Sequence, residues 1–328
     1  MTRLGFAGDV MLGRLINERQ KERSAAGIWG NMEDTLRALD GLFINLECCL
    51  SAGGTPWTDT YRPFHFRADP NWAIPALESV GVDWVNLANN HVLDYGPDAL
   101  SDTIRYLDDA GIAHSGAGAD LEAATAPAFV TVDGLDIAFV SFTDNTPEFA
   151  AKPDKVGTAY VNFDVTHPQA VRLVGKSLAR AREADPDLLV ASLHWGPNMR
   201  TEPIVEFREF ASWLAEEGVD IVHGHSAHVF QGVEVADETL VLYDTGDFVD
   251  DYATDSEHHN DRSFLFEVGV TDGELSELLL RPTEIYDLAV HEAEHYAGTW
   301  SIQRMDALSS AFGTEFQRDD DDDLVLSL

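Results

Sequence analysis

The sequence is poor in features that would place it outside the cell or in a membrane. Its two cysteines, Cys48 and Cys49, are neighbours, and a disulfide between neighbours is strained, so we expect two reduced thiols. No apolar run reaches the roughly 18 residues of a membrane-spanning helix. The residues before Asp9 are too few for a signal peptide. Together these absences predict a cytoplasmic protein without a membrane span.

Basic side chains are also scarce. The 328 residues include 21 Lys and Arg against 58 Asp and Glu, a formal net charge of −37. Nothing in the sequence could neutralise a row of phosphates, so nucleic acid is excluded as a partner. A hydrophobic fraction of 45 % argues against disorder, and the acids must then coat a folded surface. Because such a charge repels itself at low salt, the composition predicts a halophilic protein.

Apolar runs alternate with helical patterns along the chain, as in an α/β fold. The runs that read as buried strands include residues 4–12, 42–46, 82–88, 188–193 and 219–222, and helices are predicted at 97–110, 169–184, 204–217 and 291–312. No repeat or linker divides the chain. We therefore predict one domain over residues 1–316 and an acidic tail over residues 317–328, with its five consecutive aspartates, 319–323, in solvent.

Five of the apolar runs end in side chains that bind metals. These are Asp9; Glu47; Asn89, Asn90 and His91; His194; and His223, His225 and His228. Since strands of an α/β sheet present their carboxyl ends at one edge, these groups are expected to meet there. Carboxylates, amides and imidazoles together suit Mn²⁺, Fe²⁺ or Zn²⁺, and a bridging carboxylate would allow two ions.

Each of these signals also has a structural interpretation. The Asn- and Asp-rich stretch after residue 88 could be a turn that caps the next helix. Asp9 could belong to a turn, and His194 could be a core histidine. The most specific signal is the group of three histidines from His223 to His228, because three imidazoles in six residues have few structural uses.

The motifs taken together resemble those of the CapA proteins. This family of bacterial capsule or poly-γ-glutamate synthesis proteins (PGA_cap) belongs to the calcineurin-like metallophosphoesterase superfamily. The matching motifs are Gly8-Asp9-Val10-Met11-Leu12, Asn45-Leu46-Glu47, Phe64-His65-Phe66-Arg67, Ala88-Asn89-Asn90-His91-Val92-Leu93-Asp94-Tyr95-Gly96, Leu193-His194-Trp195-Gly196, Gly224-His225-Ser226-Ala227-His228-Val229-Phe230-Gln231 and Asp244-Thr245-Gly246-Asp247-Phe248.

The resemblance implies a four-layer sandwich of two mixed β-sheets flanked by helices. It also implies one or two divalent ions of Mn, Fe or Zn, with Glu47 at the position that bridges them and His91 as the group that protonates a leaving group or holds an oxyanion. The ligands implied are Asp9, Glu47, Asn90, His194, His225 and His228, with Asn89, His223 and Asp94 as additional candidates.

Three positions depart from the family pattern. Met11 stands where phosphoesterases usually have a histidine, which predicts a weakened metal site. Ser226 and Ala227 leave the histidine motif one imidazole short, and His223 could replace it. Asp247 stands where the family commonly has asparagine.

The function implied is the synthesis or processing of poly-γ-glutamate or another anionic polymer by metal-dependent hydrolysis of a phosphoester or an amide. Its partners would be that polymer and subunits of the polymer's synthase. Met11 and the missing imidazole favour an alternative, a non-catalytic accessory protein of the synthase. The predicted cytoplasmic location favours another, a phosphoesterase that acts on a small phosphate ester.

Overall fold

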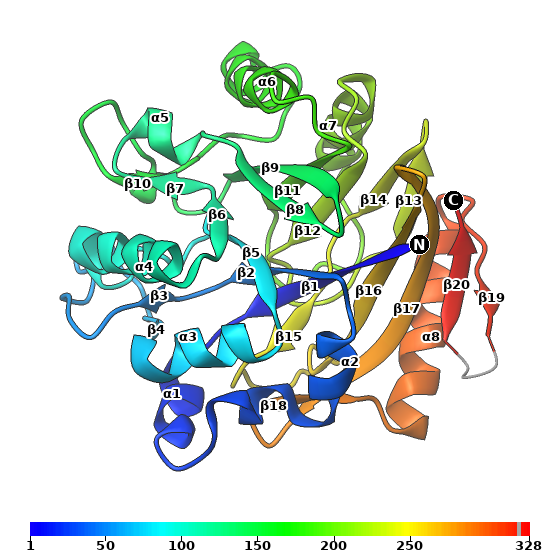
Figure 1. Cartoon of the computed structure of the whole chain (residues 1–328), viewed down its shortest axis with the longest axis horizontal. Coiled ribbons are helices and arrows are strands. Elements are labelled where there is room, and N and C mark those ends of the chain that lie inside the picture. The colour runs from blue at the N-terminus through cyan, green and yellow to red at the C-terminus, as the bar shows by residue number, and fades with distance from the viewer. Residues whose placement is uncertain (320–322) are drawn as a thin grey trace.

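The computed structural model describes residues 1–319 and 323–328, and two large sheets dominate it (Figure 1). Within those residues the larger sheet has ten strands. Their order is β19 (Gln317–Arg318), β20 (Leu324–Ser327), β17 (Glu274–Tyr286), β16 (Arg262–Thr271), β1 (Thr2–Val10), β2 (Gly41–Leu46), β5 (Val82–Asn86) and β6 (Ala113–Ser115), while β15 (Asp247–Val249) pairs with β1 and β18 (Ala289–Glu292) with β17.

The smaller sheet has six strands in the described part of the chain. Their order is β13 (Val233–Ala236), β14 (Thr239–Leu242), β12 (Ile221–His225), β11 (Leu188–His194), β9 (Leu135–Thr143) and β8 (Ala128–Val132). Two short pairs complete the strands, β3 (Cys49–Leu50) with β4 (Arg67–Ala68) and β7 (Ala117–Gly118) with β10 (Gly157–Thr158).

Helices cover the outer faces of both sheets, so that the molecule is layered (Figure 1). The helices are α1 (Arg14–Gln20), η1 (Ala25–Met32), α2 (Glu33–Arg37), α3 (Pro70–Ser79), α4 (Gly96–Ala110), α5 (Leu121–Ala124), η2 (Pro147–Phe149), α6 (Pro168–Arg182), α7 (Val205–Glu216) and α8 (His295–Ser310). One apolar core lies between the larger sheet and α1 to α4, and another between the smaller sheet and α6 and α7. A third core joins the two sheets, with Phe43 of β2 against Phe139 of β9.

Parallel pairing brings the carboxyl ends of the central strands together. β1, β2 and β5 are parallel to one another, as are β9, β11 and β12. The two sheets meet at β1 and β12, where His223 Nε2 donates a hydrogen bond of 3.1 Å to the carbonyl oxygen of Ala7. Gly8 permits the close approach of the chain before β15, since a Cβ at Gly8 would lie 1.8 Å from the carbonyl oxygen of Gly246.

The α/β sandwich expected from the sequence is confirmed, and two details at the C-terminal end differ from expectation. The predicted helix 291–312 begins at His295 in α8, because the preceding residues pair with β17 as β18. Residues 317–318 and 324–327 of the predicted tail form β19 and β20; β20 pairs with β17, and β19 pairs with β20 at the edge of the larger sheet. The division into a domain and a tail at residue 317 stays a prediction.

The aspartates near the C-terminus are not all in solvent. Asp319 is exposed, but Asp323 is buried and accepts a hydrogen bond of 2.7 Å from Arg281 Nη1. The expectation for Asp320, Asp321 and Asp322 lies outside the described residues. No helix in the described ranges combines the length and the apolar character needed to cross a bilayer.

Candidate metal centre

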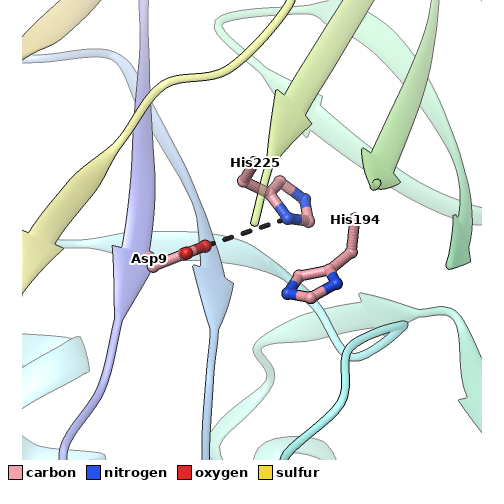
Figure 2. Close-up of side chains that lie close together, drawn as sticks. All are labelled: Asp9, His194 and His225. Carbon is pink, nitrogen blue, oxygen red and sulfur yellow. Dashed lines mark ion pairs between the residues drawn. The ribbon is translucent and has the colours of Figure 1, made fainter. Parts of the chain in front are cut away.

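Four strand ends converge on one buried point. Asp9 lies near the end of β1, and Glu47 directly follows β2. His194 and His225 are the last residues of β11 and β12, where they lie opposite each other in register. Figure 2 shows Asp9 extending from the larger sheet toward His225, with the His194 ring beside it. The polar residues that follow the apolar strands of the two sheets therefore meet in one cluster.

The cluster contains two groups whose ligand atoms all lie within 4.8 Å of one another. One group is Asp9, His194 and His225, and the other is Asp9, Glu47 and His228. All five side chains are buried. Asp9 is common to both groups, whereas the sequence led us to expect the shared position at Glu47. Glu47 nevertheless lies close to the first group, because its Oε1 is 3.7 Å from His194 Nε2.

Several atoms of the cluster are buried without a hydrogen-bond partner. They include Glu47 Oε1, His194 Nε2 and His225 Nδ1, and the last of these lies 3.9 Å from Asp9 Oδ1. A buried polar atom without a partner costs about 1–3 kcal/mol, so a native protein rarely leaves several together. A divalent cation in the first group would satisfy the two imidazole atoms, and one in the second group would satisfy Glu47 Oε1. The donor set therefore fits a transition-metal site.

Neighbouring groups hold Asp9, Glu47 and His225 in place. Asn45 Nδ2 donates a hydrogen bond of 2.7 Å to Asp9 Oδ1, and the Tyr252 hydroxyl donates one of 2.9 Å to Glu47 Oε2. The Ser192 hydroxyl lies 3.0 Å from His225 Nε2. Such contacts orient metal ligands in other proteins, because they fix which atom faces the ion.

His228 lies between two carboxylates. Its Nδ1 is 2.8 Å from Asp247 Oδ1 and 3.4 Å from Asp9 Oδ2. Burial alone would lower the pKa of His228, but the charges of Asp247 and Glu47 outweigh burial and raise this pKa well above its ordinary value. Burial alone would raise the pKa of Asp9, yet the hydrogen bond and the charge of His228 hold it well below its ordinary value. Asp9 and His228 therefore form a buried ion pair.

Asp247 belongs to this centre, although the sequence analysis singled it out only as a departure from the family pattern. β15 pairs with β1 so that Asp247 lies opposite Asp9. Asp247 Oδ2 is buried without a partner. In the sequence, Asp247 comes shortly after the apolar run 239–243, and the other candidate ligands also follow apolar runs.

His91 is held in a network beside the centre. Its Nδ1 lies 2.5 Å from Asp94 Oδ2, and the Phe66 ring stacks on the imidazole with the ring centroids 3.9 Å apart. Asp94 also accepts hydrogen bonds from the Phe66 amide at 2.8 Å and from Arg62 Nε at 3.1 Å. Asp94, an additional ligand candidate from the sequence, therefore orients His91 and lies outside the two groups.

The asparagines have different roles. Asn89 Oδ1 accepts the backbone amides of His91 at 3.0 Å and Val92 at 3.1 Å, so Asn89 shapes a turn as its structural interpretation predicts, but no side chain among the described residues caps α4, contrary to that interpretation. Asn90 is half-buried, and its Oδ1 has no hydrogen-bond partner. Asn90 lines the cavity described below and lies outside the two groups of possible ligands.

His223 and Met11 point away from the cluster. Besides its bond to Ala7, His223 contacts the Phe6 ring at 5.4 Å between centroids, and burial lowers the pKa of this imidazole to about 4. His223 is a neutral core histidine that joins the two sheets. The structure does not bring it to the position of the imidazole that the histidine motif lacks. Met11 is buried in the helix-side core, where its Sδ accepts the Gly13 amide at 3.0 Å.

A cavity of about 620 Å³ opens beside the centre. His91, Asn90, His228 and Tyr252 form the side of the cavity nearest the candidate ligands. The remaining lining residues are Arg14, Tyr61, Arg62, Pro63, Phe64, Phe66, Asn198, Met199 and Ala253. The arrangement therefore places a buried cluster of ligands and a stacked imidazole next to a space that can admit a substrate.

The chain is similar to several known proteins. Residues 3–252 match the family described as bacterial capsule synthesis protein PGA_cap. A "probable polyglutamine synthesis accessory protein" of Mycobacterium tuberculosis is 33 % identical over 299 residues, which cover 87 % of this chain and 77 % of that protein. The PGA biosynthesis protein CapA of Bacillus subtilis is 27 % identical over 248 residues, 75 % of this chain and 62 % of that protein.

Among solved structures, a hypothetical protein from Thermus thermophilus is similar in fold. Its crystal structure superposes with a TM-score of 0.51 at 16 % identity, covering 87 % of this chain and 100 % of that one. At this identity the likeness concerns the fold alone.

Proposed function

Because this chain belongs to the PGA_cap family of bacterial capsule synthesis proteins, we propose that it acts in the synthesis or processing of a poly-γ-glutamate-type anionic polymer. We propose that it does so by hydrolysing an amide bond of that polymer at the metal centre. The name of the Bacillus relative, a PGA biosynthesis protein, supports the polymer, whereas the Mycobacterium relative is named as an accessory protein of polyglutamine synthesis. The geometry of the centre supports the hydrolysis.

One observation supports the centre more than any other. Buried ligand atoms from both sheets face one another without hydrogen-bond partners, at Glu47, His194 and His225. These residues would hold Mn²⁺, Fe²⁺ or Zn²⁺ together with Asp9, His228 and, from the cavity side, Asn90. When bound, such an ion would polarise the amide carbonyl and make the attacking water more acidic.

The protein's own groups would then direct the reaction. Water adds to the carbonyl carbon, the C–N bond breaks, and the departing nitrogen takes up a proton, which leaves a carboxylate and an amine. His91 would supply that proton from Nε2, because its Nδ1 is bound to Asp94. The stacked Phe66 ring fixes the imidazole plane, so that the proton is delivered in one direction.

The test is metal content, measured by mass spectrometry on protein purified in molar KCl, together with the chain length of poly-γ-glutamate after incubation. Glu47→Gln keeps the volume of the side chain and removes a candidate ligand. Glu267→Gln is its control, because Glu267 is equally buried in the same sheet but pairs with Arg3 and Arg281 instead. We expect metal and polymer cleavage in wild type and in Glu267→Gln, and loss of both in Glu47→Gln.

A second candidate is a non-catalytic accessory protein that binds the polymer or its synthase. The position of Met11 favours it, because the Met11 sulfur is turned toward Gly13 and supplies nothing to the centre. Polymer binding by a wild-type protein that takes up no metal, even after addition of Mn²⁺, would select the accessory role. Cleavage of p-nitrophenyl phosphate, with the polymer left intact, would instead indicate a phosphoesterase acting on a small ester.

A further inference from the structure

The charged side chains that line the cavity are opposite in sign to the net charge of the molecule. The chain carries 58 acidic and 21 basic side chains, yet among the described residues none that lines the cavity is Asp or Glu. Its charged lining consists of Arg14 and Arg62, accompanied by the imidazoles of His91 and His228. A concave surface with one sign of charge concentrates ligands of the other sign. The cavity is therefore suited to an anionic group.

Arg62 is already used by the protein. Its Nε donates to Asp94 Oδ1 at 3.1 Å, its Nη1 to Thr146 Oγ1 at 3.2 Å and its Nη2 to the carbonyl oxygen of Asn90. The side chain is 11 % exposed, and its guanidinium lies over the Phe149 ring. These contacts hold the turn that carries Asn90 and His91, so Arg62 has little capacity left for a ligand.

Arg14 has that capacity. Its side chain is 32 % exposed, and its guanidinium lies over the rings of Phe64 and Phe66, at 5.2 and 5.6 Å from their centroids. One nitrogen, Nη2, lies 3.1 Å from Asp251 Oδ1. The Asp251 side chain has no exposed surface, so it anchors the guanidinium without presenting its own charge to the cavity. The other guanidinium donors remain for a ligand.

The backbone at Arg14 is held in an unfavourable conformation. Its φ is +51°, in the left-handed region that an arginine rarely adopts. The next amide, of Leu15, donates to Asp251 Oδ2 at 2.8 Å, so the same carboxylate fixes the backbone and the guanidinium. Strain that the surroundings maintain in this way is common at ligand sites, where it places a side chain before the ligand arrives.

We propose that Arg14 binds a carboxylate of the substrate in this cavity and thereby sets the specificity of the site for a polycarboxylate. The inference deepens the proposed function and rests on it in taking the cavity as the place of the substrate. A γ-linked glutamate chain carries one free carboxylate for each amide bond. Its methylene groups would lie against Phe64 and Phe66 while Arg14 forms a two-pronged contact with a carboxylate.

The test is the affinity of a γ-linked pentaglutamate, measured by calorimetry in molar KCl on the protein as purified. Arg14→Asn removes the charge and keeps a residue that tolerates a left-handed backbone. Arg14→Lys keeps the charge without the planar fork. Arg105→Gln is the matched control, because Arg105 likewise lies over an aromatic ring, that of Tyr106, and pairs with an acid, Asp102, outside the cavity. Thermal unfolding of each variant checks that it is folded.

We expect Arg14→Asn to weaken binding by about 10- to 100-fold, Arg14→Lys by about threefold to tenfold, and Arg105→Gln to leave it unchanged. The same pentamer with its carboxylates converted to carboxamides should bind wild type and Arg14→Asn equally weakly. Unchanged affinity of folded Arg14→Asn for the pentamer would overturn the inference. So would Arg14-dependent binding of phenyl phosphate by a protein that does not bind the pentamer.

This experiment separates the inference from the proposed function. A protein that contains no metal and cleaves no polymer, but binds the pentamer through Arg14, would refute the hydrolytic proposal and support the role of Arg14. If the wild-type protein cleaves the polymer and the Arg14→Asn variant binds the pentamer as tightly as wild type does, the hydrolytic proposal is supported and the role of Arg14 is refuted.

Discussion

Replacing Asp244 should change how the stability of the metal-free protein depends on pH. Asp244 follows β14 and is 1 % exposed. Its Oδ1 accepts the Gly246 amide at 2.9 Å and its Oδ2 the Ala227 amide at 2.8 Å. Burial, with the charge of Asp9 as a second cause, raises the pKa of Asp244 from 3.8 to about 8. Asp244 is therefore protonated in the folded protein over a range in which it is ionised in the unfolded chain.

The sign of the effect follows from that difference. A carboxyl with a raised folded pKa contributes its full stability below about pH 4 and loses it as the pH rises through the folded pKa, near 8. Each pH unit between these two pKa values lowers the free energy of unfolding by about 1.4 kcal/mol, so the total loss is at most ~6 kcal/mol. Relaxation of the loop would reduce that loss. Above about pH 8 the loss should be complete.

Urea unfolding, followed by tryptophan fluorescence after chelation of metals, measures this effect at constant KCl from pH 4 to 9. Asp244→Asn cannot titrate, although its amide nitrogen would face a backbone N–H and cost about 1 kcal/mol at every pH. The readout is therefore the slope with pH of the difference in unfolding free energy between wild type and Asp244→Asn. A flat difference across pH 4 to 8 would refute the assigned titration.

Two further substitutions and one truncation test the architecture. Gly8→Ala would place a Cβ 1.8 Å from the Gly246 carbonyl and force β1 and β15 apart, so we expect a loss of more than about 3 kcal/mol in urea unfolding, or no folded protein. His223→Leu removes the bond between the sheets and should cost about 1–3 kcal/mol by the same measurement, while metal content, if His223 is no ligand, stays as in wild type. Deleting residues 324–328 removes β20 and exposes the edge of β17, which should lower the thermal midpoint, whereas an unchanged midpoint would show that β20 contributes little.

The ends of the buried strands were predictable from the sequence. A carboxylate or imidazole directly after an apolar run, as at Glu47 or His194, cannot be accommodated in a core unless it has a partner. Parallel pairing brings such residues to one edge of each sheet, and the packing of the two sheets then brings Asp9 of β1 near His225 of β12, although 216 positions separate them. The α/β class follows from the same alternation of apolar runs and helical patterns, whereas the sandwich of two sheets was implied by the resemblance to the CapA proteins.

The contacts between loops were not predictable in this way. Asp247 reaches the centre because β15, three residues long, pairs with β1, and nothing local to that strand indicates its partner. Arg14 acquires its exposed position from Asp251, which lies far away in the sequence. β20 was hidden by the aspartates that precede it, because their charge suggests a solvated tail while the strand after them is apolar. The sequence pattern indicates which residues are polar and where strands end, but pairing between distant loops depends on the whole fold.

The affinity for a polycarboxylate should depend on salt, because basic side chains line the cavity while the molecule as a whole is negatively charged. A polycarboxylate approaching a chain of net charge −37 is repelled over a distance set by ionic screening, and it is attracted at short range by Arg14 in the cavity. The screening length falls from about 8 Å in 0.15 M salt to about 3 Å in 1 M, so added salt removes the long-range repulsion first and weakens the direct contact less. Binding of the γ-linked pentaglutamate should therefore tighten as KCl rises from about 0.15 M to 1 M, opposite to the usual behaviour of proteins that bind polyanions. Calorimetry over that range measures it, and affinity that falls steadily with salt would mean that the surface acids lie too far from the cavity to matter.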